Sequence, residues 1–563
     1  MKPTALLALL PLLLAACGGG GGDSSGSTTP PPTERGSLTV GLAGSAAPGI
    51  AKAWVTVQAL ALHADAGQPW SATDSSWVQL RLAQPVTVDL VALVNGSTQG
   101  LLVGQSLRAG SYGQMRLFLL GQEAALTSSA KTLGLDYNAQ VEYQDAGGSS
   151  RRVPLELADV SLGLRLAGPF TIKANEDSNL LLQWDLERSL VRFGADDGID
   201  RFTLRPELRS YDVSNSGAIV GLVDKTAFCA SGVRRDDCIY DAVATALLPD
   251  DQGLARRAVR SSPLQLSSDY ARFGLYPLPV LAQGQTYDVL IRGRNMRTLM
   301  IRQVPAPSAG LLGATPTWLG VAPANPSQPQ PLVPVLQPQG DAKVTLATAM
   351  KPGNKRLFFA QSLPGDSLPL EIGNANIDPF AGGLAAALPL PTGALQVASY
   401  SSSQALQFET VTPQQGAGGY QLRALGSRYQ DPGTAQQLQT TAGATLALTA
   451  AEPATKAGLG SAVLKVTIGA GTSARFDAAQ LIVSDAHGPV LTREVSTLIG
   501  GGSVELSLPA GAAAAQLGAG AEYAVSLRAW KRSAPSSSLV WVRGTSTVDL
   551  RSGTGTSLTL ALP

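Results

Sequence analysis

The sequence predicts an all-β protein built from tandem β-sandwich domains of immunoglobulin-like or transthyretin-like character. Helical periodicity is almost absent, whereas short runs of alternating apolar and polar residues recur, as in Ser503-Val-Glu-Leu-Ser-Leu508. The 61 Gly and 37 Pro supply many turn positions between these runs. Strands separated by turns every 8–12 residues or so are typical of sandwiches and barrels.

The first residues of the chain have the pattern of an export signal. Lys2 precedes an apolar stretch from Ala5 to Leu14, and Leu14-Ala-Ala-Cys17 follows. The stretch is shorter than the roughly 20 residues that a membrane span requires. Leu-Ala-Ala-Cys resembles the lipobox of bacterial lipoproteins. The resemblance implies a signal peptide over residues 1–16 and a lipid on the Cys17 thiol, and the alternative is an ordinary signal peptide with a chance cysteine.

Residues 17–34 predict a tether between the lipid and the folded body. They begin with a run of glycines and continue with Ser, Thr and Pro, a composition that is first flexible and then stiffer. Gly rather than Asp follows Cys17, which in the Gram-negative sorting pattern favours the outer membrane. We therefore expect a lipid anchor in the outer membrane, with the body on either its periplasmic or its external face.

Composition narrows the range of partners. The chain has 42 basic and 41 acidic residues, a net charge of +1, without a basic cluster. Nucleic acid is therefore not an expected partner. Beyond the amino end, no apolar stretch is long enough to span a membrane. We expect membrane contact through the lipid, no cofactor, and an envelope protein or glycan as the unidentified partner.

Two cysteines besides Cys17 occur close together, in Cys229-Ala-Ser-Gly-Val-Arg-Arg-Asp-Asp-Cys238. In an oxidising compartment such a pair predicts a disulfide that closes a short loop. Closure of a loop this short stabilises a fold by about 2–3 kcal/mol. A metal site would need further ligands, and no histidine lies nearby.

Breaks in the strand pattern divide the chain into four β domains. A Pro-rich stretch predicts a semi-rigid linker, and a shorter joint lies near residue 455. The expected boundaries are 1–16 signal peptide, 17–34 tether, 35–212 first domain, 216–304 second domain, 305–340 Pro-rich linker, 341–450 third domain and 461–563 fourth domain.

The first domain contains three characteristic blocks. They are Val88-Asp-Leu-Val-Ala-Leu-Val-Asn-Gly96, Ala109-Gly-Ser-Tyr-Gly-Gln-Met-Arg-Leu117 and Asp185-Leu-Glu-Arg-Ser-Leu-Val191. In this order the blocks resemble the DUF4382 family, a domain of unknown function found in bacterial lipoproteins. The resemblance covers about a third of the chain. It implies a β-sandwich but no activity, because the family has no established one.

The later domains give weaker resemblances. The second domain opens with Gly217-Ala-Ile-Val-Gly-Leu-Val223 and closes with Gly284-Gln-Thr-Tyr-Asp-Val289. These segments resemble carboxypeptidase-regulatory-like or Cna-B-like sandwiches, which implies a prealbumin-type fold and a spacer role. The third domain resembles no family. The strand-like segments around Trp530 and Trp541 make the fourth domain look immunoglobulin-like.

The blocks of the first domain also predict local structure. A turn at Ala109-Gly110 directs Tyr112 into the core, and strand alternation then places Arg116 and Leu117 on opposite faces. Asp185 and Arg188 predict an ion pair at the rim of the domain. When exposed, such a pair contributes only about 0–1 kcal/mol.

Candidate catalytic residues are scarce. Only His63 and His487 could serve a histidine-dependent hydrolase. His63 ends a strand-like run, where a half-exposed histidine is ordinary, and His487 lies in a turn. A glycosidase needs two carboxylates across a cleft, and no local motif nominates two. We predict no catalytic residues. Tryptophans could stack on sugars or fill cores, and the core is expected for Trp54 and Trp184.

An acidic loop is a weak metal candidate. Asp196, Asp197 and Asp200 surround Gly198, and Ca²⁺ requires six to eight oxygen ligands on such a loop. The full calcium-loop pattern is missing, and a plain hairpin loop is the favoured interpretation.

These observations predict a non-catalytic, lipid-anchored envelope protein that acts as a scaffold, adhesin or binding module. The alternatives are a glycan-acting enzyme with paired carboxylates and a Ca²⁺-dependent adhesive module.

Overall fold

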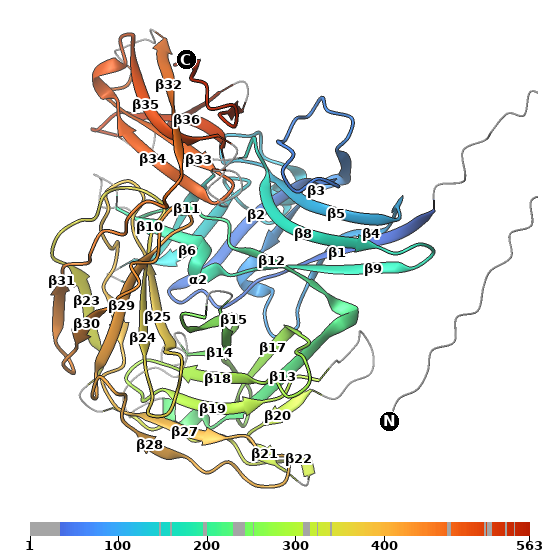
Figure 1. Ribbon diagram of the computed structural model, residues 1–563, viewed down its shortest axis with the longest axis vertical. Helices are drawn as coiled ribbons and strands as arrows, with labels where there is room; N and C mark the ends of the chain where they lie inside the picture. Colours follow the sequence, from blue (N-terminus) through green and yellow to red (C-terminus); the bar gives the residue numbers. More distant parts are fainter. Residues whose placement is uncertain are drawn as a thin grey trace, which may run out of the picture.

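The computed structural model confirms the all-β class (Figure 1). It describes residues 34–145, 148–157, 160–194, 200–228, 242–250, 253–307, 316–323, 325–337, 340–469, 475–511, 514, 521–534, 538–544 and 547–563. We refer to residues 34–215 as the first body, 216–337 as the second, 340–450 as the third and 460–563 as the fourth. The predicted signal peptide and tether, with Cys17, lie outside the described residues apart from residue 34.

The first body is a sandwich of two sheets. One sheet has the order β12-β9-β1-β4, and the other has the order β10-β11-β7-β6-β2-β5-β8 with β3 paired to β2. The strands are β1 (Arg35–Ala43), β2 (Ile50–His63), β3 (Val78–Asp89), β4 (Gln99–Arg108), β5 (Gly110–Leu119), β6 (Gln140–Gln144), β7 (Ser150–Glu156), β8 (Leu164–Ile172), β9 (Asp177–Trp184), β10 (Leu190–Phe193), β11 (Arg201–Leu204) and β12 (Leu208–Asp212). The short helices are η1 (Leu90–Ala92), α1 (Ser128–Thr132), α2 (Leu186–Ser189) and η2 (Val213–Asn215). β1 is a central strand, parallel to β9 and antiparallel to β4.

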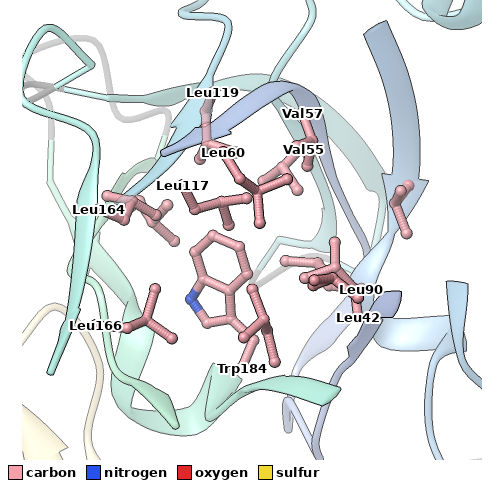
Figure 2. Close-up of a cluster of buried hydrophobic side chains, with 14 of the residues drawn as sticks. Leu42, Val55, Val57, Leu60, Leu90, Leu117, Leu119, Leu164, Leu166 and Trp184 are labelled. Atoms are coloured by element: carbon pink, nitrogen blue, oxygen red, sulfur yellow. The ribbon is translucent and has the colours of Figure 1, made fainter. Parts of the chain in front are cut away.

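Trp184 occupies the core between these two sheets (Figure 2). Its side chain is fully buried among leucines that β5 and β8 supply, including Leu117, Leu164 and Leu166. Strand alternation produces this core, because every second side chain of β1 and β5 points inward. The predicted core positions of Trp184 and Trp54 are confirmed, since Trp54 is also buried.

The local predictions for the first body have mixed outcomes. Tyr112 is buried as predicted, after Gly110 with a φ of 147°. Leu117 faces the core, and Arg116 faces the opposite side of its sheet, toward the fourth body. The predicted ion pair of Asp185 and Arg188 is present, with Nε of Arg188 3.5 Å from the carboxylate, but it is not exposed at a rim. Arg188 is only 5% exposed, because α2 lies against the third body.

The second and third bodies share a ten-stranded sheet with the order β28-β27-β19-β18-β14-β15-β25-β24-β29-β30. Strands of the second body form its centre, and strands of the third body lie on both sides of them. The strands are β14 (Val243–Pro249), β15 (Arg256–Pro263), β18 (Tyr287–Arg292), β19 (Leu299–Val304), β24 (Arg356–Gln361), β25 (Leu370–Asn376), β27 (Leu395–Ser399), β28 (Glu409–Val411), β29 (Gly419–Leu425) and β30 (Gln436–Gln439). Leu290 and Met300 of the second body pack into the core of the third.

A smaller sheet closes each of these two bodies. The second body adds the sheet β16-β17-β13-β20, and the third adds β26-β23-β31. The remaining elements are β13 (Ser216–Val223), η3 (Lys225–Phe228), β16 (Gln265–Leu266), β17 (Ala271–Pro279), β20 (Thr317–Leu319), β21 (Val321–Ala322), β22 (Asn325–Pro329), β23 (Ala342–Leu346), β26 (Leu388–Leu390) and β31 (Thr445–Leu448).

The Pro-rich segment, expected as a linker over residues 305–340, lies along the second body in its described part. β20 pairs in parallel with β13. Further on, the Leu332 N–H donates to the Leu222 carbonyl at 3.0 Å, and the Arg297 N–H donates to the Val335 carbonyl at 2.9 Å. Proline has no N–H to donate. In a Pro-rich segment, backbone hydrogen bonds of this kind can still form through the N–H groups of the residues between the prolines and through the carbonyls of all residues.

The fourth body is another sandwich, with sheets β35-β32-β39 and β34-β33-β36-β37, to which β38 adds through β36. Its elements are β32 (Gly460–Gly469), β33 (Ala478–Asp485), β34 (Gly488–Glu494), η4 (Ser496–Leu498), β35 (Gly502–Ala510), β36 (Glu522–Trp530), β37 (Val540–Arg543), β38 (Val548–Asp549) and β39 (Thr556–Ala561). The chain passes from the first body through the second and third to the fourth, which lies beside the first again (Figure 1). The first body therefore contacts all three others.

Candidate functional site

A buried ion pair joins the first body to the third. Nη2 of Arg188 lies 2.6 and 2.5 Å from the two carboxylate oxygens of Glu371, and both side chains are almost fully buried. The Ala258 N–H, from the second body, donates to the same carboxylate at 3.1 Å. Burial opposes ionisation of Glu371, but the charge of Arg188 outweighs it and lowers the pKa of Glu371. Three bodies thus meet at one carboxylate.

Two further carboxylates connect the first body to the fourth. Glu522 of β36 lies 2.8 Å from Nη2 of Arg116 and accepts the Trp70 N–H at 2.7 Å. Glu156 of β7 lies 2.9 Å from Nη1 of Arg528. The Arg528 guanidinium also covers aromatic rings of the first, third and fourth bodies, those of Phe193, Phe380 and Trp530. Charged side chains pointing away from the cores therefore hold the bodies together.

Other contacts complete this arrangement. Oδ1 of Asn95 accepts hydrogen bonds from the Ser262 hydroxyl at 2.8 Å and the Gly274 N–H at 2.6 Å, joining the first body to the second. Arg428 of the third body lies 2.8 Å from Asp485 of the fourth, and both are buried.

A cleft of about 1000 Å³ lies where the four bodies meet, and we call it the junction cleft. Its lining comes from several separate segments. The charged residues and the histidine that line it are Arg188, Arg205, Glu207, Arg209, Asp250, Arg257, Arg356, Glu371, Asp431, Lys456 and His487. The volume of this cleft is in the range of small-molecule sites, but its lining is far more charged than that of most such sites.

Two arginines in this cleft share one carboxylate. Nη2 of Arg356 lies 2.5 Å from Oε1 of Glu207, and Nη2 of Arg205 lies 3.4 Å from the same oxygen. Burial and then the charge of Arg356 lower the pKa of Arg205 to about 9, against the opposing effect of Glu207. For Glu207, burial favours the neutral acid, but Arg356 and Arg205 outweigh it and lower its pKa to about 2. This side of the cleft has more positive than negative charge.

The two aromatic rings in the lining each have a cation over one face. The Arg257 guanidinium lies 4.9 Å from the centre of the Phe358 ring, and the Lys355 ammonium lies 5.1 Å from that of Tyr429. Arg257 also lies 3.2 Å from Asp250. These rings therefore already contact protein cations.

The structure places the two histidines in different settings. His63 ends β2 as predicted but is buried rather than half-exposed, with Nδ1 accepting the Asp65 N–H at 2.9 Å and Nε2 lying 2.9 Å from the Ser76 hydroxyl. His487 lies in the turn between β33 and β34 and borders the junction cleft. Its backbone carbonyl accepts from Nδ2 of Asn354 at 2.5 Å.

Most of the other predicted site residues lie outside the described part of the chain. These are Cys17, Cys229, Cys238, Asp196 and Asp197. Asp200 is described, and its carboxylate pairs with Arg192. Within the described ranges, no group of three His, Cys, Asp or Glu side chains is placed to hold a metal ion. Among those same residues, no helix is long and apolar enough to cross a membrane.

Sequence reasoning missed the junction cleft. Its arginines belong to segments that look ordinary when taken singly, and no motif joins them. The available signal was the cluster Arg205-Pro-Glu-Leu-Arg209, where three charged residues follow the short strand β11. Such a charged cluster next to a core strand suggests that this surface forms an interface. It does not indicate which part of the chain, or which ligand, the interface contacts.

The fold and cleft define a class: an all-β assembly of packed sandwiches with a charged site where they meet. Residues 35–206 match DUF4382, described as a domain of unknown function. The first body therefore contains a DUF4382 domain, as the three sequence blocks predicted. No curated protein matches the chain.

Solved structures give only distant similarity. The Bacillus anthracis TIE protein is 8% identical over 91% of this chain and 69% of its own, with a TM-score of 0.14. A leucine-rich repeat protein from Bacteroides thetaiotaomicron is 14% identical over 40% of this chain and 26% of its own, with a TM-score of 0.12. The Streptococcal ancillary pilin is 12% identical over 62% of this chain and 99% of its own, also with a TM-score of 0.12. TM-scores this low support no inference about function.

Proposed function

We propose that this protein is a non-catalytic, lipid-anchored protein of the cell envelope that acts as a binding module on a rigid β scaffold. The junction cleft carries the proposal. All four bodies contribute to its lining or to the contacts that fix its walls. A site assembled in this way is preorganised, which lowers the cost of ordering its side chains when a ligand binds.

The sequence supports the cellular position. Leu14-Ala-Ala-Cys17 and the Gly-rich residues after it favour lipidation of Cys17 and the outer membrane. In this proposal Cys229 and Cys238 form a disulfide, consistent with an oxidising compartment. The second body is a spacer of the carboxypeptidase-regulatory-like type, placed next to the DUF4382 domain.

The setting of His63 supports a non-catalytic role. Both of its ring nitrogens lie within hydrogen-bond distance of groups in neighbouring turns, so the ring fixes local structure. If the proposal holds, alanine substitution of His63 and His487 leaves the cellular phenotype of the protein unchanged. A phenotype lost on substitution of either histidine, in a variant that folds normally, contradicts it.

The anchor and the exposed face are tested by fractionation and protease treatment of intact cells, with an epitope near the C-terminus. The Cys17→Ser variant is the unanchored control. The native protein should sediment with the outer membrane, and Cys17→Ser should be soluble. Digestion on intact cells means that the body faces outward, and protection until the envelope is opened means that it faces the periplasm. A Cys17→Ser variant that stays membrane-bound contradicts the anchor.

A further inference from the structure

The charges around the junction cleft are unbalanced. Among the described residues that line it, six are basic (five Arg and one Lys) and four are acidic. Two partners just outside the lining cancel each other, because Asp185 lies 3.5 Å from Arg188 and Arg423 lies 2.7 Å from Asp431. The lining itself therefore has two more basic than acidic side chains, in a partly enclosed space where the local dielectric constant is lower than in water.

The surplus is concentrated near the start of β12. Arg205 is buried, and within the described ranges its guanidinium makes only long polar contacts, 3.4 Å to Glu207 and 3.4 Å to Oδ1 of Asn376. Its neighbour Arg356 makes the short contact with Glu207. Burial, and then the charge of Arg356, lower the pKa of Arg205 to about 9, so a further negative charge beside it would favour its ionised form.

Arg209 extends this positive group to the surface. It is exposed on β12, it lines the cleft, and it has no ion-pair partner within 4.0 Å in the described part of the chain. Its guanidinium lies near Tyr211, whose hydroxyl donates to the Val259 carbonyl at 3.1 Å. A guanidinium at the surface end and another buried behind it can hold a ligand that enters from solvent.

The side-chain types indicate the chemistry of the ligand. A guanidinium presents paired N–H donors that match carboxylate, phosphate and sulfate oxygens, and five of the six cations here are arginines. A neutral sugar would instead need free aromatic faces, but the rings of Phe358 and Tyr429 each have a cation over one face already. Other walls of the cleft carry further basic side chains, among them Arg257, whose guanidinium lies 3.2 Å from Asp250.

We propose, on the basis of the binding function above, that the junction cleft binds a small molecule carrying two or more oxyanion groups, with Arg205, Arg209 and Arg356 as its main contacts. The anionic groups can be carboxylates or phosphates, since both have the same donor requirement. The volume of about 1000 Å³ accommodates a molecule with several such groups.

The test is isothermal titration calorimetry on the full chain carrying Cys17→Ser, with citrate, pyrophosphate and the neutral sugar maltotriose as probes. The expected result is saturable 1:1 binding of citrate or pyrophosphate, weakened by added salt, and no binding of maltotriose. Citrate binding alone indicates a carboxylate ligand, and pyrophosphate binding alone indicates a phosphate ligand. Binding of neither anion, or of maltotriose only, overturns the inference.

Substitutions place the binding in the cleft. Arg209→Gln should weaken binding by about tenfold, since one charge-assisted hydrogen bond is lost at an exposed position that the fold does not require. The matched control is Arg272→Gln, at an exposed position of β17 that does not line the cleft, and its affinity should equal that of the parent. Arg205→Gln should weaken binding at least as much. If the Arg205→Gln variant fails to fold, the affinity of Arg209→Gln still tests whether the anion binds in the cleft. Equal losses in Arg209→Gln and Arg272→Gln mean non-specific charge attraction and overturn the proposal.

The two proposals fail in different ways. If citrate or pyrophosphate binds and is chemically consumed, the non-catalytic role is wrong while the anion site stands. If no anion binds but Cys17→Ser releases the protein from the membrane, the site is wrong while the anchor stands.

Discussion

The core of the first body and the junction cleft are built in opposite ways. The core places an indole, Trp184, among aliphatic side chains whose inward positions alternate along each strand. The junction is held by charged side chains whose partners are remote in sequence, as with Arg188 and Glu371, 183 residues apart. The contrast shows that alternation specifies each sandwich, whereas ion pairs between distant segments specify how the sandwiches fit together.

The largest effect is expected in the core. Trp184→Ala removes a fully buried side chain and should lower the free energy of unfolding of the first body by about 3–5 kcal/mol. Urea unfolding followed by circular dichroism measures this change. The control is Trp318→Ala, because Trp318 is 38% exposed and its loss should cost far less. Equal effects of the two substitutions would mean that the aromatic core does not dominate stability.

The next effect tests the junction. Glu371→Ala leaves Arg188 buried without its main partner and should destabilise the assembly by about 3 kcal/mol. The double variant Arg188→Met/Glu371→Leu removes both charges and should recover most of the loss. Unfolding of the two variants is compared, and hydrogen exchange at α2 and β25 locates the change. A double variant less stable than Glu371→Ala would show that the pair stabilises the junction in its own right.

The stability of the protein should depend on pH through the ionisable side chains of the junction, whereas the apolar core should not contribute to this dependence. The pKa of Glu207 is about 2 in the folded protein, below its ordinary 4.5, so its ionisation favours folding. This contribution is fully present above pH 4.5 and is lost as pH falls toward 2. Urea unfolding between pH 5 and 2 should therefore show a steeper decline for the native protein than for Glu207→Gln. Identical slopes would mean that Glu207 has its ordinary pKa.

The smallest loss of stability is expected for an exposed ion pair. Lys173 and Glu176 form an exposed pair at 3.3 Å, with side chains 65% and 60% exposed. Lys173→Ala should change the free energy of unfolding by less than about 0.5 kcal/mol, because solvent screens such pairs. Thermal unfolding at low and high salt measures it. A loss as large as that of Glu371→Ala would contradict the distinction between buried and exposed pairs.

The fold of the individual bodies could be predicted from the sequence, whereas the junction cleft could not. The all-β class, the buried Trp54 and Trp184, and the DUF4382 domain followed from alternation and sequence blocks, which are local signals. The environment of Arg188 could not be predicted. Its local partner Asp185 is visible at i–3, but Glu371 lies on β25 of the third body, and only the folded chain brings Arg188 and Glu371 together.

The position of β1 has a mechanical consequence. The chain that precedes residue 34 enters the folded protein through β1, which lies between β9 and β4 rather than at the edge of its sheet. A pull directed along β1 loads its hydrogen bonds to both neighbours in shear, so that many must break together instead of opening one by one. Tension applied at the amino end therefore enters the DUF4382 domain at a central strand, where resistance to extraction is greater than at an edge strand.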